Sequence, residues 1–274
     1  MVIYKPFIKL YCKDARSMTE IADSSVHLII TSPPYFDLKN YNENNTHDNQ
    51  LGSPKNYEEY INTLNKVWKE CIRVLVPDGK LCINIMPIFL SRDETEFKRR
   101  VTKLAITDIE NFMESTKEMY LQSLYIWDKR KIVRFSSFGS YPYPPNIFST
   151  FPFEWIIVFS KKGKRVEKVS PEIKEASKIS TKEWQDWAIN SLWEMQPARA
   201  KSIGHPAPFP EELPSRLIKL YSFVGDIVLD PFAGSGTTIV AAQKLHRNGI
   251  GYEINPDYIK LAHKRLKQIT LNVT

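Results

Sequence analysis

The chain has 274 residues, 42% of them hydrophobic and 25% charged, which is typical of one large domain with its own core. Its apolar stretches are too short to span a bilayer and its first ten residues carry no export signal, so we expect a cytoplasmic protein without membrane contact. Three widely separated cysteines and scattered histidines argue against a disulfide framework or a metal site, and the net charge of +7 weakly favours a polyanionic partner.

The first third of the chain alternates between predicted strands and a predicted helix. Residues 7–12 and 26–30 are predicted strands, and the second is almost continuously apolar, as in a parallel strand covered on both faces. Asn56 is the predicted N-cap of a helix, with Glu59 at the capping-box position. A turn at Pro77-Asp78-Gly79 leads into a further strand at 81–85, and this order predicts an α/β fold.

The middle of the chain is less regular. Residues 91–120 are charged and predicted to be helical, whereas 139–152 is rich in proline and aromatic residues and is predicted to be a loop. Residues 154–160 form a predicted strand that a basic turn follows. The segment 166–197 is polar with three tryptophans, and the sequence does not indicate its organisation.

Regular alternation returns in the last quarter. We predict a helix at 211–221, a strand at 226–229, and a glycine-containing turn at 230–238 that opens a helix ending near residue 247. A strand at 249–253 follows. The last helix begins at Asn255-Pro256, a cap followed by a first-turn proline.

The turn at 230–238 has the features of a nucleoside site. Gly234 and Gly236 allow a ligand close to the backbone between a buried strand and a helix, where open α/β sheets bind ligands. Glu253, nineteen residues after Gly234, can accept hydrogen bonds from two ribose hydroxyls. A phosphate loop would need a lysine, and a nicotinamide site a third glycine where Ile239 stands. An S-adenosylmethionine site needs neither.

A second motif, Thr31-Ser32-Pro33-Pro34-Tyr35, directly follows the predicted strand at 26–30. An exocyclic amine of a base is a poor nucleophile because its lone pair is delocalised into the ring. The Ser32 hydroxyl and the Pro33 carbonyl can accept hydrogen bonds from the two N–H groups of this amine. The two prolines stiffen the loop, and Tyr35 offers a flat face for stacking on the base. A base in a duplex must be flipped out to reach such a loop. Alone, the motif is more typical of a surface turn or polyproline-II stretch than of a catalytic loop, and its position directly after the strand favours function.

Together the two motifs resemble those of the β-class amino-methyltransferases of DNA, which are typical of restriction–modification systems. The segments 12–16 and 205–214 resemble those that precede the two motif strands in that family. The resemblance implies a Rossmann-like S-adenosylmethionine-dependent methyltransferase fold with permuted motif order, plus a smaller target-recognition insertion. It divides the chain into a catalytic half at 1–160, a candidate target-recognition region at 161–199 and a cofactor half at 200–274.

The resemblance also implies a role for individual residues. Ser32, Pro33, Pro34 and Tyr35 would be catalytic. Asp14 would contact the adenine of the cofactor and Glu253 its ribose, with Asp14 as a turn residue the alternative. The other residues expected around the cofactor are Thr31, Phe209, Asp230, Pro231, Phe232, Gly234, Ser235, Gly236 and Thr237. Phe209 is equally compatible with a simple core position.

In this family, serine at the position of Ser32 usually accompanies N4-cytosine methylation, and Asp or Asn accompanies N6-adenine methylation. The sequence therefore predicts transfer to the N4 amine of cytosine in double-stranded DNA. Carbon-5 methylation would need a nucleophilic cysteine, usually after proline, and none of the three cysteines follows a proline. The alternatives are an N6-adenine enzyme, an RNA or protein amino-methyltransferase, and a DNA-binding protein that has lost catalysis.

Basic residues give two candidate DNA contacts. The cluster of Lys161, Lys162, Lys164 and Arg165 is expected to position phosphates, with a solvated hairpin turn the alternative. A second patch comprises Lys129, Arg130, Lys131 and Arg134. The three tryptophans at 184, 187 and 193 are more often core than base-stacking residues. We also expect a cognate endonuclease that acts separately, and a protein that is a monomer or a homodimer.

Overall fold

The protein is described by a computed structural model that covers residues 4–36, 51, 54–92, 94–96, 98–131, 138–149, 151–196 and 209–271. Its centre is an eight-stranded sheet in the order β1-β12-β11-β2-β3-β9-β6-β10. Only β9 runs antiparallel to its neighbours, and the other pairs within the sheet are parallel. The bounds of these strands in sheet order are Ile8–Tyr11, Asn248–Tyr252, Ile227–Asp230, Val26–Thr31, Leu75–Ile85, Phe153–Lys161, Met119–Asp128 and Leu192–Glu194.

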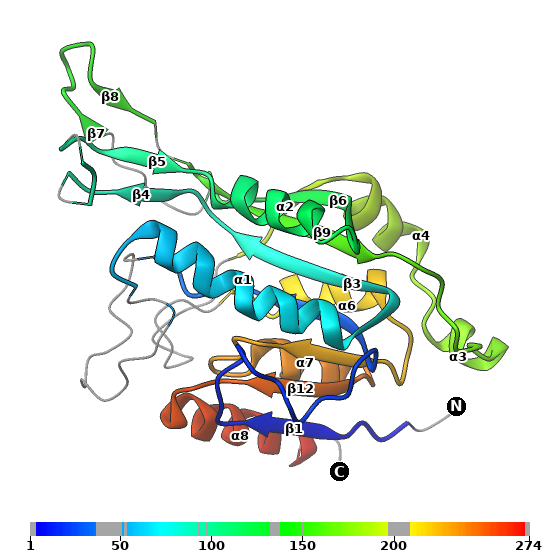
Figure 1. Ribbon diagram of the computed structural model, residues 1–274. Coiled ribbons are helices and arrows are strands. Elements are labelled where there is room, and N and C mark those ends of the chain that lie inside the picture. Colours follow the sequence, from blue (N-terminus) through cyan, green and yellow to red (C-terminus); the bar gives the residue numbers. More distant parts are fainter. Residues whose placement is uncertain are drawn as a thin grey trace.

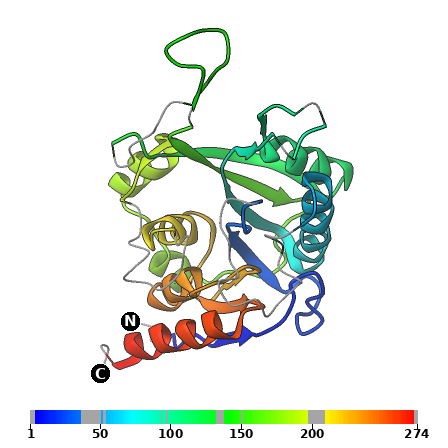
Figure 2. The same ribbon diagram turned by 90° about the vertical axis from the view of Figure 1, so that its left-hand side faces the viewer.

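Helices cover both faces of the sheet (Figures 1 and 2). Helices α1 (Tyr57–Val74) and α2 (Ala105–Ser115) bury one face, and α6 (Glu212–Tyr221) and α7 (Thr237–Lys244) bury the other. Along β2, Ile29 joins the first core while Leu28 and Ile30 join the second. This two-sided burial explains the continuous apolar run and confirms the predicted parallel strand.

The two ends of the chain meet in the sheet. Strand β1 pairs in parallel with β12, the last strand, and α8 (Pro256–Leu271) packs its Leu266 with Ile8 and Leu10 of β1. The first strand therefore extends the sheet from the last, as expected for a Rossmann-like fold with permuted motif order.

Several predicted elements are confirmed by their hydrogen bonds. Asn56 caps α1 by accepting from the Glu59 amide at 2.8 Å, and Asn255 caps α8 by accepting from the Asp257 amide at 2.9 Å. The capping box predicted with Glu59 differs, since the Glu59 carboxylate accepts from the Lys55 amide at 2.9 Å rather than from the Asn56 amide. Strand β3 begins earlier than predicted and runs through Pro77-Asp78-Gly79, with a register shift against β2.

The middle of the chain differs from the sequence prediction. Residues 91–120 are not one helical stretch: strand β4 (Ile88–Leu90) pairs with β5 (Val101–Lys103), and only α2 is helical. The predicted loop at 139–152 contains a hairpin of β7 (Phe138–Gly139) and β8 (Ile147–Phe148). The segment after β9 holds the short helices α3 (Pro171–Ala176) and α4 (Thr181–Glu183), the π-helix η1 (Trp184–Ile189), and β10.

The sheet direction divides the connections between two edges. The carboxyl ends of β2, β3, β6, β11 and β12 lie at one edge, which we call the carboxyl edge. Because β9 is antiparallel, it starts at the carboxyl edge and ends at the opposite one. Figure 1 shows β4–β5 and β7–β8 projecting beyond the end where the β3 arrow points, and α3 lying at the other end.

Candidate active site

The two sequence motifs meet at the carboxyl edge. Strands β2 and β11 are adjacent and end at Thr31 and Asp230, both fully buried. The Thr31 hydroxyl donates to Asp230 Oδ1 at 2.8 Å. The expected catalytic loop and the expected cofactor turn are therefore joined by a direct hydrogen bond.

Asp230 also orders the turn that follows it. Its Oδ1 accepts from the Phe232 amide at 3.0 Å and its Oδ2 from the Thr238 hydroxyl at 2.6 Å. Burial raises the pKa of Asp230 to about 6, although these bonds favour the ionised form. Its carboxylate thus faces three protein donors. The expected contact with the methionine part of a cofactor stays a prediction.

Left-handed backbone shapes the glycine turn. Gly234 has φ +48° and Gly236 has φ +80°, and Gly236 is the N-cap of α7. A Cβ at Gly236 would lie 2.9 Å from the Ala262 Cβ of α8, so the turn and that helix approach closely. The buried Pro231 and Ala233 complete the packing of the turn.

Arg265 of α8 holds the far side of this turn. Its Nη1 donates to the Ser235 carbonyl at 2.7 Å, to Ser235 Oγ at 3.0 Å and to Thr237 Oγ1 at 3.0 Å. Both hydroxyl side chains, expected near a cofactor, are thereby engaged from within the protein. No local sequence signal indicates Arg265, because the bond depends on the packing of α8.

Glu253 lies directly after β12 and faces the glycine turn. Its Oε2 accepts from the Gly234 amide at 3.0 Å and its Oε1 from the Asn255 amide at 2.8 Å. Burial, with a contribution from Asp230, raises the pKa of Glu253 to about 7. Each carboxylate oxygen can accept more than one hydrogen bond, so this acid fits the hydroxyls of a ribose.

Asp14 lies at the same edge as Glu253. The Glu253 amide donates to the Tyr11 carbonyl at the end of β1, three residues before Asp14. The Asp14 carboxylate accepts from the Arg16 amide and Nε, both at 2.8 Å. The structure therefore brings the two expected cofactor acids to neighbouring strand ends, and Asp14 also closes a local turn.

The two expected cofactor phenylalanines occupy different surroundings. Phe232 is partly buried and packs edge-on against Trp68 of α1, with ring centroids 6.3 Å apart. Phe209 packs against the core on the side of α6 and α7. Contact of either ring with a cofactor stays a prediction.

The loop after β2 is held by a buried polar cluster. Ser32 Oγ lies 3.2 Å from the Tyr35 hydroxyl, which donates to Glu154 Oε2 at 3.0 Å. Asn84 of β3 donates to the same Glu154 oxygen at 2.5 Å and lies 3.5 Å from Ser32 Oγ. Lys129 pairs with Glu154 Oε1. Tyr35 is only 8% exposed, so most of its ring is covered; its stacking on a base stays a prediction.

Sequence reasoning missed Glu154 and Asn84. They come from β9 and β3, far from the Ser32 loop in sequence, and only the pairing of these strands brings them together. Glu154 and Asn84 are 6% and 2% exposed. A carboxylate and an amide in otherwise apolar strands were the available signal.

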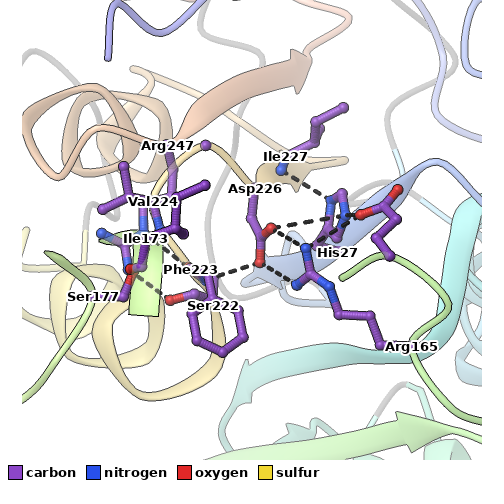
Figure 3. Close-up of polar contacts among 12 residues, drawn as sticks. His27, Arg165, Ile173, Ser177, Ser222, Phe223, Val224, Asp226, Ile227 and Arg247 are labelled. Carbon is purple, nitrogen blue, oxygen red and sulfur yellow. Dashed lines mark hydrogen bonds and ion pairs between the residues drawn. The ribbon is translucent and has the colours of Figure 1, made fainter. Parts of the chain in front are cut away.

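The basic cluster 161–165 lies at the opposite edge from Ser32. Lys161 Nζ donates to the carbonyls of Ile72 at 2.6 Å and Leu75 at 2.9 Å. Figure 3 shows Arg165 paired with Asp226, to which it donates at 2.8 and 2.7 Å. Lys162 and Lys164 are exposed. Phosphate contacts by this cluster stay a prediction, and two of its four residues already have structural partners.

The expected target-recognition region begins at the same edge, because β9 ends there at Lys161. The region then crosses the α6 side of the sheet, where Trp187 of η1 packs against the core and its carbonyl accepts from Trp193 Nε1 at 3.1 Å. Strand β10 lies beside the carboxyl end of β6, where Glu194 aligns with Asp128. Residues 197–199 of that region, Arg134 of the second patch and residues 205–208 lie outside the described residues. Trp193 is fully buried, as expected for core, whereas Trp184 is 49% exposed.

The described part of the chain contains neither a candidate metal site nor a candidate membrane-spanning helix. Among those residues, no group of three His, Cys, Asp or Glu side chains is arranged to hold a metal ion. No helix within the same residues has the length and apolar character needed to cross a membrane.

Comparison with known proteins gives concordant matches. Residues 26–264 match the N6/N4 DNA methylase family model. The type II methyltransferase M.MjaI of Methanocaldococcus jannaschii is 37% identical over 273 residues, covering 90% of this chain and 87% of that protein. A putative DNA modification methylase of Thermus thermophilus, solved with S-adenosyl-L-methionine, superposes with a TM-score of 0.74 at 31% identity, covering 95% and 93% of the two chains.

A more distant structure shares the fold. The cytosine-N4-specific PvuII DNA methyltransferase has a TM-score of 0.59 at 20% identity, covering 96% of this chain and 89% of that one.

Proposed function

The chain belongs to the N6/N4 family of DNA methylases, and we propose that within this family it methylates the N4 amine of cytosine in duplex DNA. It is an S-adenosylmethionine-dependent DNA methyltransferase. What supports the finer assignment is Ser32, at the carboxyl end of β2, where the family places the residue that receives the target amine.

Transfer begins with a base that has left the duplex stack. S-adenosylmethionine, when bound, supplies an electrophilic methyl group on a sulfonium. The Ser32 hydroxyl and the Pro33 carbonyl accept hydrogen bonds from the two N–H groups of the amine. These bonds draw the nitrogen lone pair out of conjugation with the ring. The adjacent prolines hold both acceptors in place before the base arrives.

The buried cluster fixes the direction of the Ser32 hydroxyl. Tyr35 has one hydroxyl proton and gives it to Glu154, so the 3.2 Å contact leaves Ser32 as the donor to Tyr35. The Ser32 oxygen accepts from the Asn84 amide at 3.5 Å and keeps a second lone pair to accept a hydrogen bond from the target amine. Glu154 is in this account a positioning residue, which acts on the base amine only through Tyr35 and Ser32.

The residues at the strand ends fit the cofactor. Glu253 would hold the ribose, Asp14 would approach the adenine, and Phe232 would line the pocket beside Trp68. The Thr31–Asp230 bond fixes the separation between this pocket and the Ser32 loop. The residues that hold the methyl donor and those that hold the amine are therefore on two strands joined side by side.

The match to type II relatives supports a place in a restriction–modification system, beside a separately acting endonuclease. We propose that the protein acts as a monomer or homodimer. The second candidate is N6-adenine methylation by the same site, because the family includes both reactions.

Two modified duplexes test the base assignment. In one, every cytosine is replaced with N4-methylcytosine, and in the other every adenine is replaced with N6-methyladenine. With a radiolabelled methyl donor, the proposal predicts label in the N6-methyladenine duplex and none in the N4-methylcytosine duplex. The reverse result would overturn the assignment to cytosine and leave the family unchanged. Parallel reactions with RNA and protein test the remaining substrate classes.

A further inference from the structure

Two insertions occupy the carboxyl edge beside the Ser32 loop. The β4–β5 insertion follows the carboxyl end of β3, and the β7–β8 hairpin lies between the carboxyl end of β6 and the start of β9. Both therefore project from the edge at which a flipped base must arrive. Figure 1 shows the β7–β8 hairpin reaching furthest beyond the sheet.

The hairpin tip carries aromatic side chains that are exposed to solvent. Tyr141 is 72% exposed, Tyr143 74% and Ile147 54%. Tyrosine combines a flat apolar ring with a polar hydroxyl, which suits a surface that becomes buried against a partner with both kinds of group. Base edges in a DNA groove offer donors, acceptors and thymine methyl groups.

Hydrogen bonds within the hairpin hold this tip in one shape. The Ser140 amide donates to the Asn146 carbonyl at 2.8 Å, and the Tyr143 amide donates to the Ser140 carbonyl at 2.7 Å. Prolines at 142, 144 and 145 restrict the backbone further. A tip ordered in advance loses little conformational entropy when it binds.

An aromatic ladder joins this region to the main sheet. Phe89 of β4 packs on Phe151 at 5.7 Å, Phe151 on Phe153 at 5.8 Å, and Phe153 on Trp155 of β9 at 5.5 Å. The β4–β5 insertion and the segment that leaves the hairpin are thus fixed to the strand that carries Glu154.

The β4–β5 insertion adds positive charge at the same edge. Its turn carries Lys98, Arg99 and Arg100 in succession, and all three are exposed. Buried Thr95 holds the turn, since its hydroxyl donates to the Arg99 carbonyl at 2.6 Å and accepts from the Arg99 amide at 3.0 Å.

We propose that the β7–β8 hairpin and the 98–100 turn form the surface that reads the DNA target. Tyr141 and Tyr143 enter a groove and contact bases, while Lys98 and Arg99 hold the phosphates beside it. Each arm of the hairpin, about five extended residues long, spans roughly 16 Å, which is enough to reach the floor of a major groove about 8.5 Å deep. The inference rests on DNA methylation by this family and does not depend on which base is methylated.

Matched pairs of variants at the two edges test this surface. The first pair compares the double variant Tyr141→Ala/Tyr143→Ala with Tyr120→Ala, since Tyr120 is 45% exposed near the opposite edge. The second compares Lys98→Ala/Arg99→Ala with Lys162→Ala/Lys164→Ala. Calorimetry with S-adenosylmethionine confirms that each variant is folded, because every substituted position lies outside the cofactor residues.

Methyl transfer, counted as total label in DNA, is measured together with duplex binding by fluorescence anisotropy over a range of salt concentrations. We expect the tyrosine double variant to lose about 10- to 100-fold in kcat/KM for DNA and to spread methylation to near-target sequences, as mapped by sequencing. The Lys98/Arg99 variant should lower the salt slope of binding by about 2, and the Tyr120→Ala control should match the wild type. The Lys162/Lys164 variant measures, for comparison, the phosphate contacts that the sequence predicts for the cluster at 161–165.

The proposal is overturned if the tyrosine variant matches Tyr120→Ala in rate and in the sequences methylated. It is equally overturned if the salt slope falls for Lys162/Lys164 and not for Lys98/Arg99. Counting label in all bases separates this test from the cytosine assignment: a wild-type product of N6-methyladenine would remove that assignment and leave this comparison valid.

Discussion

Replacing Glu253 with glutamine tests the proposed ribose contact at nearly constant shape. The carboxylate accepts from the Gly234 and Asn255 amides, and glutamine can supply only one acceptor oxygen to these donors and to a ribose. A hydrogen bond to a charged group contributes about 1.5–3 kcal/mol. Losing one such bond predicts cofactor binding about 10- to 100-fold weaker at a pH where Glu253 is ionised.

The pKa of about 7 makes this prediction depend on pH. The ribose needs the ionised acid, so wild-type affinity should fall by up to about tenfold for each pH unit below 7 and level off above it. Glu253→Gln should lack this component. Calorimetry from about pH 5.5 to about pH 8.5 gives the difference between the two profiles, from which the cofactor's own titration cancels.

Stability provides a second readout with a fixed sign. A carboxyl whose folded pKa is raised from 4.5 to about 7 favours the protonated form in the folded state, so its ionisation destabilises the apoprotein as pH rises through this window. Allowing for partial exposure, the cost is about 2 kcal/mol, or roughly 4–8 °C in Tm. Glu253→Gln should therefore gain in Tm relative to wild type at high pH. The reasoning is refuted if wild type and Glu253→Gln show the same pH dependence of cofactor affinity and the same pH dependence of Tm.

Three further substitutions address other parts of the site. Ser32→Ala should lower kcat at least about 100-fold while cofactor affinity stays within a few-fold, and wild-type turnover would remove Ser32 from the mechanism. Glu154→Gln should lower kcat about tenfold without weakening cofactor binding, because it removes the ion pair with Lys129 and disturbs the hydrogen bond that orients Tyr35, and neither partner is expected at the cofactor; an unchanged kcat with weaker cofactor binding would contradict a positioning role. Gly236→Ala should reduce the free energy of unfolding by about 1–3 kcal/mol in urea titration, since its φ is +80° and the new Cβ would meet Ala262 at 2.9 Å; an unchanged midpoint would show that the turn adapts.

Local signals predicted the glycine turn at 230–238 and its flanking elements well. The apolar run of β11, the left-handed positions of Gly234 and Gly236 and the Asn255 cap each depend on a few consecutive residues. The parallel order of β1 beside β12 followed from the motif order that the family resemblance implied. Features of this kind need no knowledge of how distant segments pack.

The polar cluster behind Ser32 could not be predicted in the same way. Glu154 reaches Tyr35 because β9 inserts antiparallel between β3 and β6, and nothing in the residues around Glu154 indicates that neighbour. Arg265 likewise reaches Ser235 only through the packing of α8. Both are contacts between residues far apart in sequence.

Charge and composition did not predict how the middle of the chain folds. The phosphate contact predicted for the run at 161–165 stays a prediction, and the charge pattern did not indicate that β9 ends at the edge opposite Ser32. The proline and aromatic residues at 139–152 suggested a loop, and pairing of Phe138 with Phe148 makes part of it a projecting hairpin. The charges at 91–120 suggested a helix, and β4–β5 pairing outweighed that preference.

The central claim concerns the atom that receives the methyl group, and the most direct test is the identity of the product. Purified protein is incubated with duplex DNA and S-adenosylmethionine carrying a deuterated methyl group, and the digested nucleosides are identified by mass spectrometry. The account predicts labelled N4-methylcytosine, which Ser32→Ala should abolish. Labelled N6-methyladenine would contradict the claim.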